Sequence, residues 1–217
     1  MRTDGSYAQS ASDKGVHAVP AILYNGPTSP FGRMARVVAL ELGIPMEERV
    51  IDVYTAEFLD AFNPLRQIPT LVTETGVPIY DSRVICGYFD AVSGTQTLIP
   101  PGRRWEVETR WALAVGVMEA GLQRRMEIIR PAGESSAGTI AKLATRIDRA
   151  LVQLERQAGA LSDAEVRMDC IATAVALEYT DFRYTTEWRE RCPGLKAWLE
   201  GYARRRSMIQ TRPRDPN

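Results

Sequence analysis

The hydrophobic pattern changes along the chain from short apolar runs to long helical repeats. Four apolar runs in the first half predict strands, at residues 21–24, 48–53, 70–73 and 77–80. Two amphipathic stretches and one shorter segment between them predict helices, at residues 30–42, 82–93 and 56–62. The resulting order is βαβα followed by ββα, which is the thioredoxin-like order of elements.

After Pro100-Pro101-Gly102 the strand signals end. Apolar residues at helical spacing then predict four helices, around residues 111–122, 140–154, 170–184 and 195–202. We therefore expect an α/β N-terminal domain of thioredoxin-like fold followed by an all-α helical bundle domain. The expected divisions are a disordered tail at residues 1–18, the first domain at 19–95, a linker at 96–104 and the bundle at 105–217.

Composition narrows the class of protein. The 217 residues carry 27 basic and 27 acidic side chains, so no global field favours nucleic acid or an anionic membrane. No apolar stretch approaches the roughly 20 residues that a bilayer span needs, and no signal-peptide pattern opens the chain. We expect a cytoplasmic protein with neither nucleic acid nor membrane as a partner.

Cysteine and histidine exclude several chemistries. The three cysteines are far apart and form no C-x-x-C pair, and Cys86 and Cys170 lie in apolar helical patterns, which indicates buried free thiols in a reducing compartment. His17 is the only histidine and lies in the predicted tail. The folded part therefore has no Ser-His-Asp triad, no Cys-His dyad and no histidine-based metal site.

Three short motifs follow one another in the first half. Ile68-Pro69 enters a predicted strand, where a proline can turn the backbone of Ile68 outward to pair with an extended peptide. An X-Pro bond in such a setting has a raised chance of being cis, although an ordinary proline between loop and strand gives the same pattern. Asp81-Ser82 opens a predicted helix and can hold an ammonium group and a carboxylate, or Asp81 can simply cap the helix.

Ser29 lies between Pro27 and Pro30 at the start of another predicted helix. It is a poor nucleophile because no base is available, but its hydroxyl can donate a hydrogen bond to a thiolate. Such a charge-assisted bond contributes about 1.5–3 kcal/mol and lowers a thiol pKa near 8.5 by about 1–2 units. A substantial fraction of the bound thiol would then be thiolate at pH 7, which is enough for a transferase.

The chain resembles a cytosolic glutathione S-transferase from Val19 to about Pro213. The resemblance is closest to a bacterial serine-type branch whose first domain begins T-S-P-F and whose second contains D-F-R and W-R-x-x-x-P. Here those motifs are Thr28-Ser29-Pro30-Phe31, Asp181-Phe182-Arg183, and Trp188-Arg189 with Pro193. The resemblance implies glutathione as co-substrate, no metal, a homodimer and a role in detoxification.

The resemblance also implies residue roles. Ser29 matches the serine that activates the glutathione sulfur, where some relatives carry a cysteine and exchange disulfides instead. The remaining implied glutathione-binding residues are Ile68 and a cis Pro69 for the cysteinyl part, Asp81 and Ser82 for the γ-glutamyl end, Gln67 with Arg66 near the glycyl carboxylate, and Arg33 in a supporting role.

A small hydrophobic electrophile would bind between the two domains. The expected walls of this pocket are Phe31, Trp111, Val115, Met118 and Leu122, although their helical spacing equally suits core packing. Two positions depart from the branch. Val166 replaces the usual Ser or Thr cap before Asp169, so the helix would depend on Asp169 or Ser162, and Val115 replaces an Asp, which alters the pocket or reduces activity.

Three functions remain compatible with these residues. The first is transfer of glutathione to a hydrophobic electrophile, with Ser29 stabilising the thiolate. The second is a non-catalytic module that binds ligands or a partner protein on the same fold. The third is a glutathione-dependent peroxidase or dehalogenase, which would release oxidised glutathione in place of a conjugate.

Overall fold

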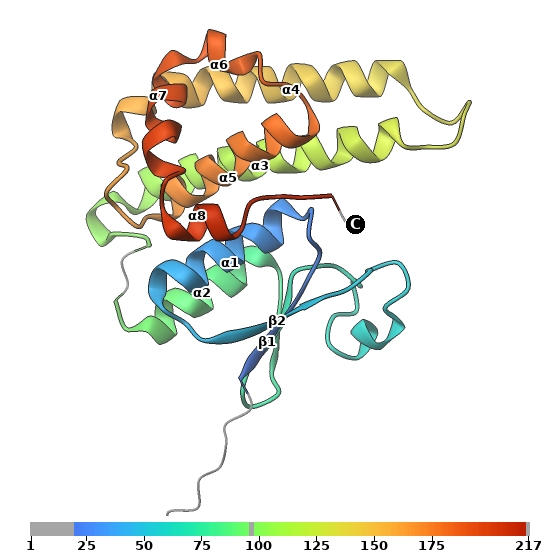
Figure 1. Cartoon of the computed structure of the whole chain (residues 1–217), viewed down its shortest axis with the longest axis vertical. Coiled ribbons are helices and arrows are strands. Elements are labelled where there is room, and N and C mark those ends of the chain that lie inside the picture. The colour runs from blue at the N-terminus through green and yellow to red at the C-terminus, as the bar shows by residue number, and fades with distance from the viewer. Residues whose placement is uncertain (1–19, 96–97, 216–217) are drawn as a thin grey trace, which may run out of the picture.

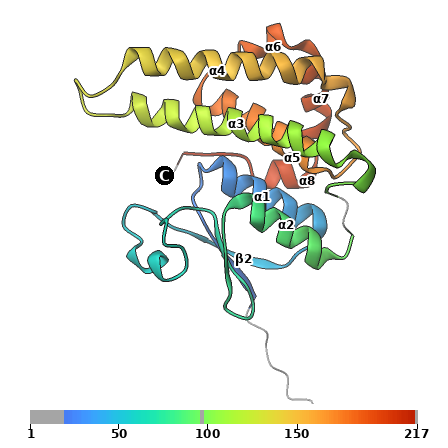
Figure 2. The ribbon, with the colours of Figure 1, turned by 180° about the vertical axis from the view of Figure 1, so that it is seen from behind.

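The computed structural model describes residues 20–95 and 98–215. The sheet, which has four strands, lies at one end of the molecule and a helical bundle at the other, with helices α1 (Pro30–Leu42) and α2 (Ser82–Ser93) between them (Figures 1 and 2). The predicted tail at residues 1–18 lies outside the described residues, as do two positions of the predicted linker. The fold is the predicted one, a thioredoxin-like sheet unit followed by an all-helical domain.

The sheet has the strand order β2-β1-β3-β4. Its strands are β1 (Ala21–Asn25), β2 (Met46–Val50), β3 (Thr70–Val72) and β4 (Pro78–Ile79). β1 runs parallel to β2 and antiparallel to β3, and β3 runs antiparallel to β4. The predicted limits of the second strand, 48–53, were wrong. The chain leaves the sheet after Ile51 because Asp52 begins a turn, accepting hydrogen bonds from the Tyr54 and Ala56 amides.

Both helices of the first unit begin and end at the residues that the sequence indicated. α1 (Pro30–Leu42) is capped by Ser29 and ends at Gly43, whose φ of 66° suits a residue without a side chain. α2 (Ser82–Ser93) is capped by Asp81 and ends at Gly94. The short predicted helix at 56–62 is a 3₁₀ turn, η1 (Glu57–Ala61).

The four predicted bundle helices are present. They are α3 (Arg104–Ile128), α4 (Ala137–Arg156), α5 (Met168–Arg183) and α7 (Pro193–Tyr202). The sequence did not indicate the short elements η2 (Pro101–Arg103), η3 (Ala158–Ala160), α6 (Trp188–Arg191) and α8 (Arg206–Gln210). In the described part of the chain, no helix combines the length and apolar character that a membrane span needs.

Helix α5 is the centre of the molecule, because twelve of its sixteen residues are buried. It packs against α3 within the bundle and against α1 across the junction with the sheet unit. One continuous hydrophobic core includes Met34 and Val38 from α1, Val117 from α3 and Ile171 from α5. The two halves therefore share a core and do not merely touch.

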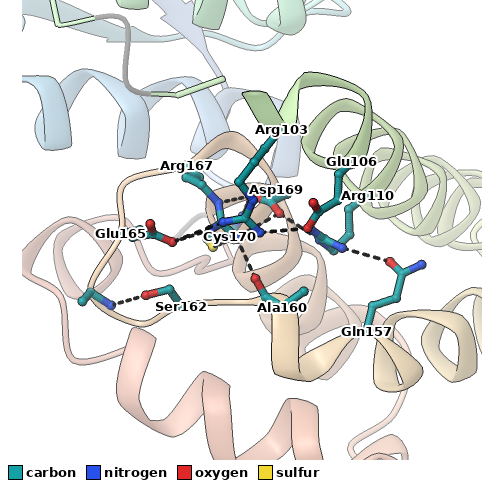
Figure 3. Close-up of polar contacts among 11 residues, drawn as sticks. Arg103, Glu106, Arg110, Gln157, Ala160, Ser162, Glu165, Arg167, Asp169 and Cys170 are labelled. Atoms are coloured by element: carbon teal, nitrogen blue, oxygen red, sulfur yellow. Dashed lines mark hydrogen bonds and ion pairs between the residues drawn. The ribbon is translucent and has the colours of Figure 1, made fainter. Parts of the chain in front are cut away.

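The start of α5 contains a buried ionic cluster (Figure 3). Asp169 is fully buried and accepts hydrogen bonds from Arg110 Nε at 2.8 Å, from Arg167 Nε at 3.0 Å and from the Cys170 amide at 3.0 Å. No side chain caps α5 from the position of Arg167, which precedes its first turn. Asp169 therefore takes over the role of the missing cap at Val166, whereas Ser162 binds the nearby Ala164 amide instead.

An outer ring of acceptors balances the two buried arginines. Arg110 donates to Glu106 at 2.7 Å, and Arg167 donates to the Ala160 carbonyl at 2.8 Å and forms an ion pair with Glu165. Hydrogen bonds from Arg103 and Arg110 lower the pKa of Glu106 from 4.5 to about 2. Asp169 neutralises only one of the two positive charges, and Glu106 and Glu165 balance the other nearer the surface.

Polar contacts also join α1 to the last part of the chain. Arg33 is buried and pairs with Glu178 of α5, and it donates to Thr211 at 3.3 Å and to the Met208 carbonyl at 3.2 Å. Arg205 binds Glu41 at 2.7 Å. These contacts anchor α8 and the segment after it beside α1, and Figure 1 shows that segment running between the bundle and the start of α1.

We expect Asp169→Asn to lower the free energy of unfolding by about 3–5 kcal/mol, because it leaves two buried guanidinium groups facing a neutral amide. Denaturant titration followed by circular dichroism would measure this loss. Glu200→Gln is the matched control, since Glu200 is exposed on α7 and makes no ion pair with any described residue. Equal stability of the two variants would contradict the structural role of the cluster.

The shifted pKa of Glu106 predicts acid sensitivity. Because this pKa is lower in the folded protein, the ion pairs of Glu106 stabilise the fold fully above pH 4.5, and that contribution is lost as the pH falls toward about 2. Glu106→Gln should therefore flatten the decline of Tm between pH 4.5 and 2, as measured by calorimetry, whereas Glu74→Gln should not. An unchanged slope in Glu106→Gln would count against this assignment.

Candidate functional site: a polar cavity joined to an apolar one

Ser29 is held at the start of α1 with its hydroxyl hydrogen unused. Ser29 Oγ accepts a hydrogen bond from the Gly32 amide at 3.2 Å, which is an ordinary N-cap contact. Because the oxygen accepts in this contact, its O–H remains able to donate to an anion, and the positive end of the helix dipole lies at the same place. Capping and anion binding are therefore compatible at Ser29.

Gly32 permits this arrangement. A Cβ atom at Gly32 would lie 1.6 Å from Asn25 Oδ1, at the end of β1. Asn25 is itself buried and donates to Glu48 at 3.0 Å, so it has little freedom to move away. The absence of a side chain at Gly32 lets α1 begin directly against the strand that precedes it.

The loop before β3 is shaped by Asn63. Its amide nitrogen donates to the Gln67 carbonyl at 3.1 Å and to Thr70 Oγ1 at 2.9 Å, and its oxygen accepts from the Leu65 amide at 3.0 Å. The Ile68-Pro69 peptide is cis, as the resemblance implied. Among the described residues, no hydrogen bond involves the Ile68 backbone, so both of its polar groups are available to a ligand.

The start of α2 provides two polar groups. Asp81 caps the helix by accepting from the Arg83 amide at 2.9 Å, so the simpler interpretation of this residue is also correct. Ser82 is nearly buried, and its hydroxyl has no hydrogen-bond partner among the residues that the structure describes. Like Ser29, it can donate to an anion at a helix N-terminus.

Sheet topology brings these three segments together. β1 leads into α1, and the antiparallel pairing of Tyr24 with Thr70 sets the start of β3 beside the end of β1. The pairing of Leu71 with Ile79 sets the end of β4, which leads into α2, beside the same point. Ser29, Ile68 and Ser82 therefore lie along one edge of the sheet unit, facing α3.

A cavity of about 270 Å³, the polar cavity, opens at this edge, and polar and apolar groups contribute equally to its wall. It contains seven of the predicted site residues: Phe31, Gln67, Ile68, Pro69, Asp81, Ser82 and Val115. The sequence analysis assigned no individual role to the other residues that line it: Asn63, Leu65, Tyr80, Arg83, Glu119 and Gln123. Glu119 Oε1 lies 3.7 Å from Arg83 Nη2. The cavity wall therefore contains two carboxylates, those of Asp81 and Glu119.

A larger, mostly apolar cavity of about 790 Å³ adjoins the polar one. Phe31, Leu65, Gln67 and Ile68 line both, and Ser29 lies in the wall of the larger. The remaining wall combines residues of the loop after β2, of α3 and of α5, among them Tyr54, Leu122, Met126, Ile129 and Tyr179. Leu122 was predicted here. Met126, Ile129 and Tyr179 carried no signal beyond helical spacing, and Tyr54 lies in a loop.

The structure does not bring three predicted site residues to either cavity. Met118 is fully buried in the core, and Trp111 packs against that core. Both follow the core-packing interpretation. Arg33 points instead to Glu178 and Thr211, where burial lowers its pKa. Val115 lines the polar cavity and not the apolar one.

Thiol and metal chemistry of the protein itself finds little support in the described residues. All three cysteines are free and buried, and burial raises the pKa of Cys170 to about 11. None of them lines either cavity. No group of three or more His, Cys, Asp or Glu residues in the described ranges could hold a metal ion.

The chain is similar to a family model, to a relative of about its own length and to solved structures. The family model described as "Glutathione S-transferase, N-terminal domain" matches residues 28–92. An uncharacterized GST-like protein of Escherichia coli K12, YibF, is 34% identical over 192 residues, which cover 86% of this chain and 95% of that protein.

Solved structures agree. A glutathione transferase family member from Pseudomonas fluorescens Pf-5 with bound glutathione superposes with a TM-score of 0.85 at 33% identity, covering 90% of this chain and all of that one. A structure from the same organism with bound S-(propanoic acid)-glutathione gives a TM-score of 0.80 at 32% identity, covering 91% of this chain and 99% of that one.

The tight contact at Gly32 yields a test. Gly32→Ala should lower the free energy of unfolding by about 1–3 kcal/mol, because the new methyl group overlaps the Asn25 side chain. Gly116→Ala in α3 is the matched control, since its Cβ would meet nothing within 4 Å and should be neutral or stabilising. A Gly32→Ala variant as stable as Gly116→Ala in denaturant titration would show that α1 can move off the strand.

Proposed function

The chain belongs to the glutathione S-transferase family, and from this premise we propose that it binds glutathione, stabilises its thiolate and transfers it to a hydrophobic electrophile. The observation that carries the proposal is the position of Ser29. A hydroxyl with a free donor stands at a helix N-terminus in the wall of an apolar cavity that adjoins a polar one. The polar cavity suits a charged peptide, and the apolar cavity suits its reaction partner.

Glutathione fits the donor and acceptor groups of the polar cavity. The γ-glutamyl carboxylate would accept from Ser82 and the first amides of α2, and its ammonium group would face Asp81 and Glu119. The cysteinyl part would pair with the free backbone of Ile68, as an added strand does. Gln67, which lines both cavities, would reach toward the glycyl end. Glutathione bound to the Pseudomonas relative supports this assignment.

The sulfur would then lie at Ser29, in the wall of the apolar cavity and two residues before Phe31, which lines both cavities. A hydrogen bond from Ser29 favours the thiolate over the thiol, and the dipole of α1 acts in the same direction. The thiolate donates an electron pair to the electrophilic carbon and forms the S–C bond. Either a leaving group departs with its own pair, or the carbanion formed at an activated double bond takes a proton from water.

This makes the protein a serine-type transferase in which Ser29 is the catalytic residue. Relatives that exchange disulfides carry a cysteine at this position, and here the cysteines lie in the core. By analogy with the family we also propose a homodimer in the cytoplasm that detoxifies small electrophiles. A monomeric mass at micromolar concentration in analytical centrifugation would contradict the dimer.

We expect bound glutathione to have a thiol pKa about 1–2 units below the free value near 8.5, and Ser29→Ala to restore most of the difference. Thiolate absorbance measured across pH would show this. Ser136→Ala is the matched control: Ser136 caps α4 in the same way, by accepting from the Thr139 amide at 3.2 Å. Both variants should lose about 1 kcal/mol of stability, but only Ser29→Ala should shift the thiol pKa.

Other outcomes would redirect the proposal. A lowered pKa that survives Ser29→Ala would transfer the role to Thr28 or to the helix amides. No binding at millimolar glutathione would leave a ligand-binding module on the same fold. Oxidised glutathione in place of a conjugate would indicate the peroxidase or dehalogenase reaction.

A further inference from the structure

The apolar cavity contains a hydroxyl, on a largely buried side chain, that the proposed reaction does not use. Tyr179 of α5 is only 3% exposed and lines the cavity, yet its hydroxyl has no hydrogen-bond partner among the described residues. The ring cannot easily turn away, because it packs closely against α3, where a Cβ atom at Gly121 would lie 3.1 Å from it. A buried phenol usually finds a partner, so this one is suited to a ligand.

Arg125 of α3 lines the same cavity without a counter-ion. The other two arginines there are paired, Arg66 with Asp60 and Arg183 with Asp215 at 2.8 Å. Within residues 20–95 and 98–215, Arg125 forms no ion pair or side-chain hydrogen bond. Its half-buried guanidinium is therefore a free cation in a mostly apolar space.

Arg125 and Tyr179 lie near one another. Burial raises the pKa of Tyr179, and the positive charges of Arg183 and Arg125 oppose that rise. At neutral pH the phenol stays protonated and donates a hydrogen bond. A guanidinium and a phenol in the wall of one cavity can both donate to a carboxylate, while Leu122, Met126 and Ile129 favour an apolar body.

Building on the function proposed above, we propose that the electrophile of this enzyme is an apolar molecule that carries a carboxylate, held by Arg125 and Tyr179. These two residues are specificity-determining and do not touch the reacting atoms. Arg125 lies on the bundle side of the cavity, on α3 near Met126 and Ile129. Of the groups assigned to glutathione, Gln67 and Ile68 line this cavity from the loop before β3, and Glu119 of α3 lines only the polar cavity, which favours the electrophile over the glycyl carboxylate.

A matched pair of substrates tests this inference. Ethacrynic acid and its methyl ester share an aryl vinyl ketone and differ only in a remote carboxylate. The thiolate adds to the terminal carbon of the double bond, the displaced π electrons form an enolate, and water returns a proton. After division by the uncatalysed rates, we expect kcat/KM of the acid to exceed that of the ester by about tenfold or more.

Variants should reduce that preference. Arg125→Gln and Tyr179→Phe should each lower the acid-to-ester ratio toward one. The phenylalanine variant keeps the buried ring, so it tests the hydroxyl without opening a cavity. Arg104→Gln is the control, because Arg104 lies exposed on the same helix, outside the cavity, and should leave the ratio as it is.

Three results would overturn the inference. The first is equal handling of acid and ester while glutathione binds and ionises, which removes the substrate class and leaves the transferase. The second is a loss of affinity for glutathione alone in Arg125→Gln, which would assign the cation to the glycyl carboxylate. If the enzyme turns over neither compound, the third is equal affinity, measured by calorimetry, for the pre-formed glutathione conjugates of the acid and of the ester. Absent glutathione binding would instead remove the proposed function itself.

Discussion

The structure depends on the burial of α5, and a buried helix start imposes a strict electrostatic condition. The first amides of a helix need acceptors, and a carboxylate placed there without water needs cations. Asp169 satisfies the amide of Cys170, and Arg110 and Arg167 neutralise Asp169. Since Arg110 belongs to α3, the cap of one helix is completed by another, so neither helix can be placed independently of its partner.

The same helix then connects the fold to the site. Its start is fixed to α3, Glu178 near its middle pairs with Arg33 of α1, and Tyr179 opens into the apolar cavity. Arg33 therefore holds α1 against the bundle four residues after Ser29. The supporting role at the site that the resemblance implied for Arg33 stays a prediction.

The part of the candidate site that the sheet unit contributes is assembled from the ends of strands and helices. The end of β1, the start of β3 and the end of β4 meet because β3 pairs antiparallel with both β1 and β4. Each junction leaves backbone or hydroxyl groups unused, at Ser29, Ile68 and Ser82. Helix ends and strand edges are the places where a folded chain keeps free donors, so a peptide ligand can bind there without displacing internal hydrogen bonds.

The sequence by itself determined the features that depend on neighbouring residues. Ser29, Gly43, Asp81 and Gly94 mark helix ends through local backbone chemistry, and apolar spacing gave the order of the elements and the four main bundle helices. The motifs around Ile68 and Ser82 were found for the same reason. Tertiary structure alone decided which residues pack against each helix face. Spacing could not separate Met118, in the core, from Val115, in a cavity wall, nor reveal that Arg110 compensates for Val166 from 56 positions away. Nor could it place Glu119, Arg125 and Tyr179 at the site, because periodicity defines a helix face but not its partner.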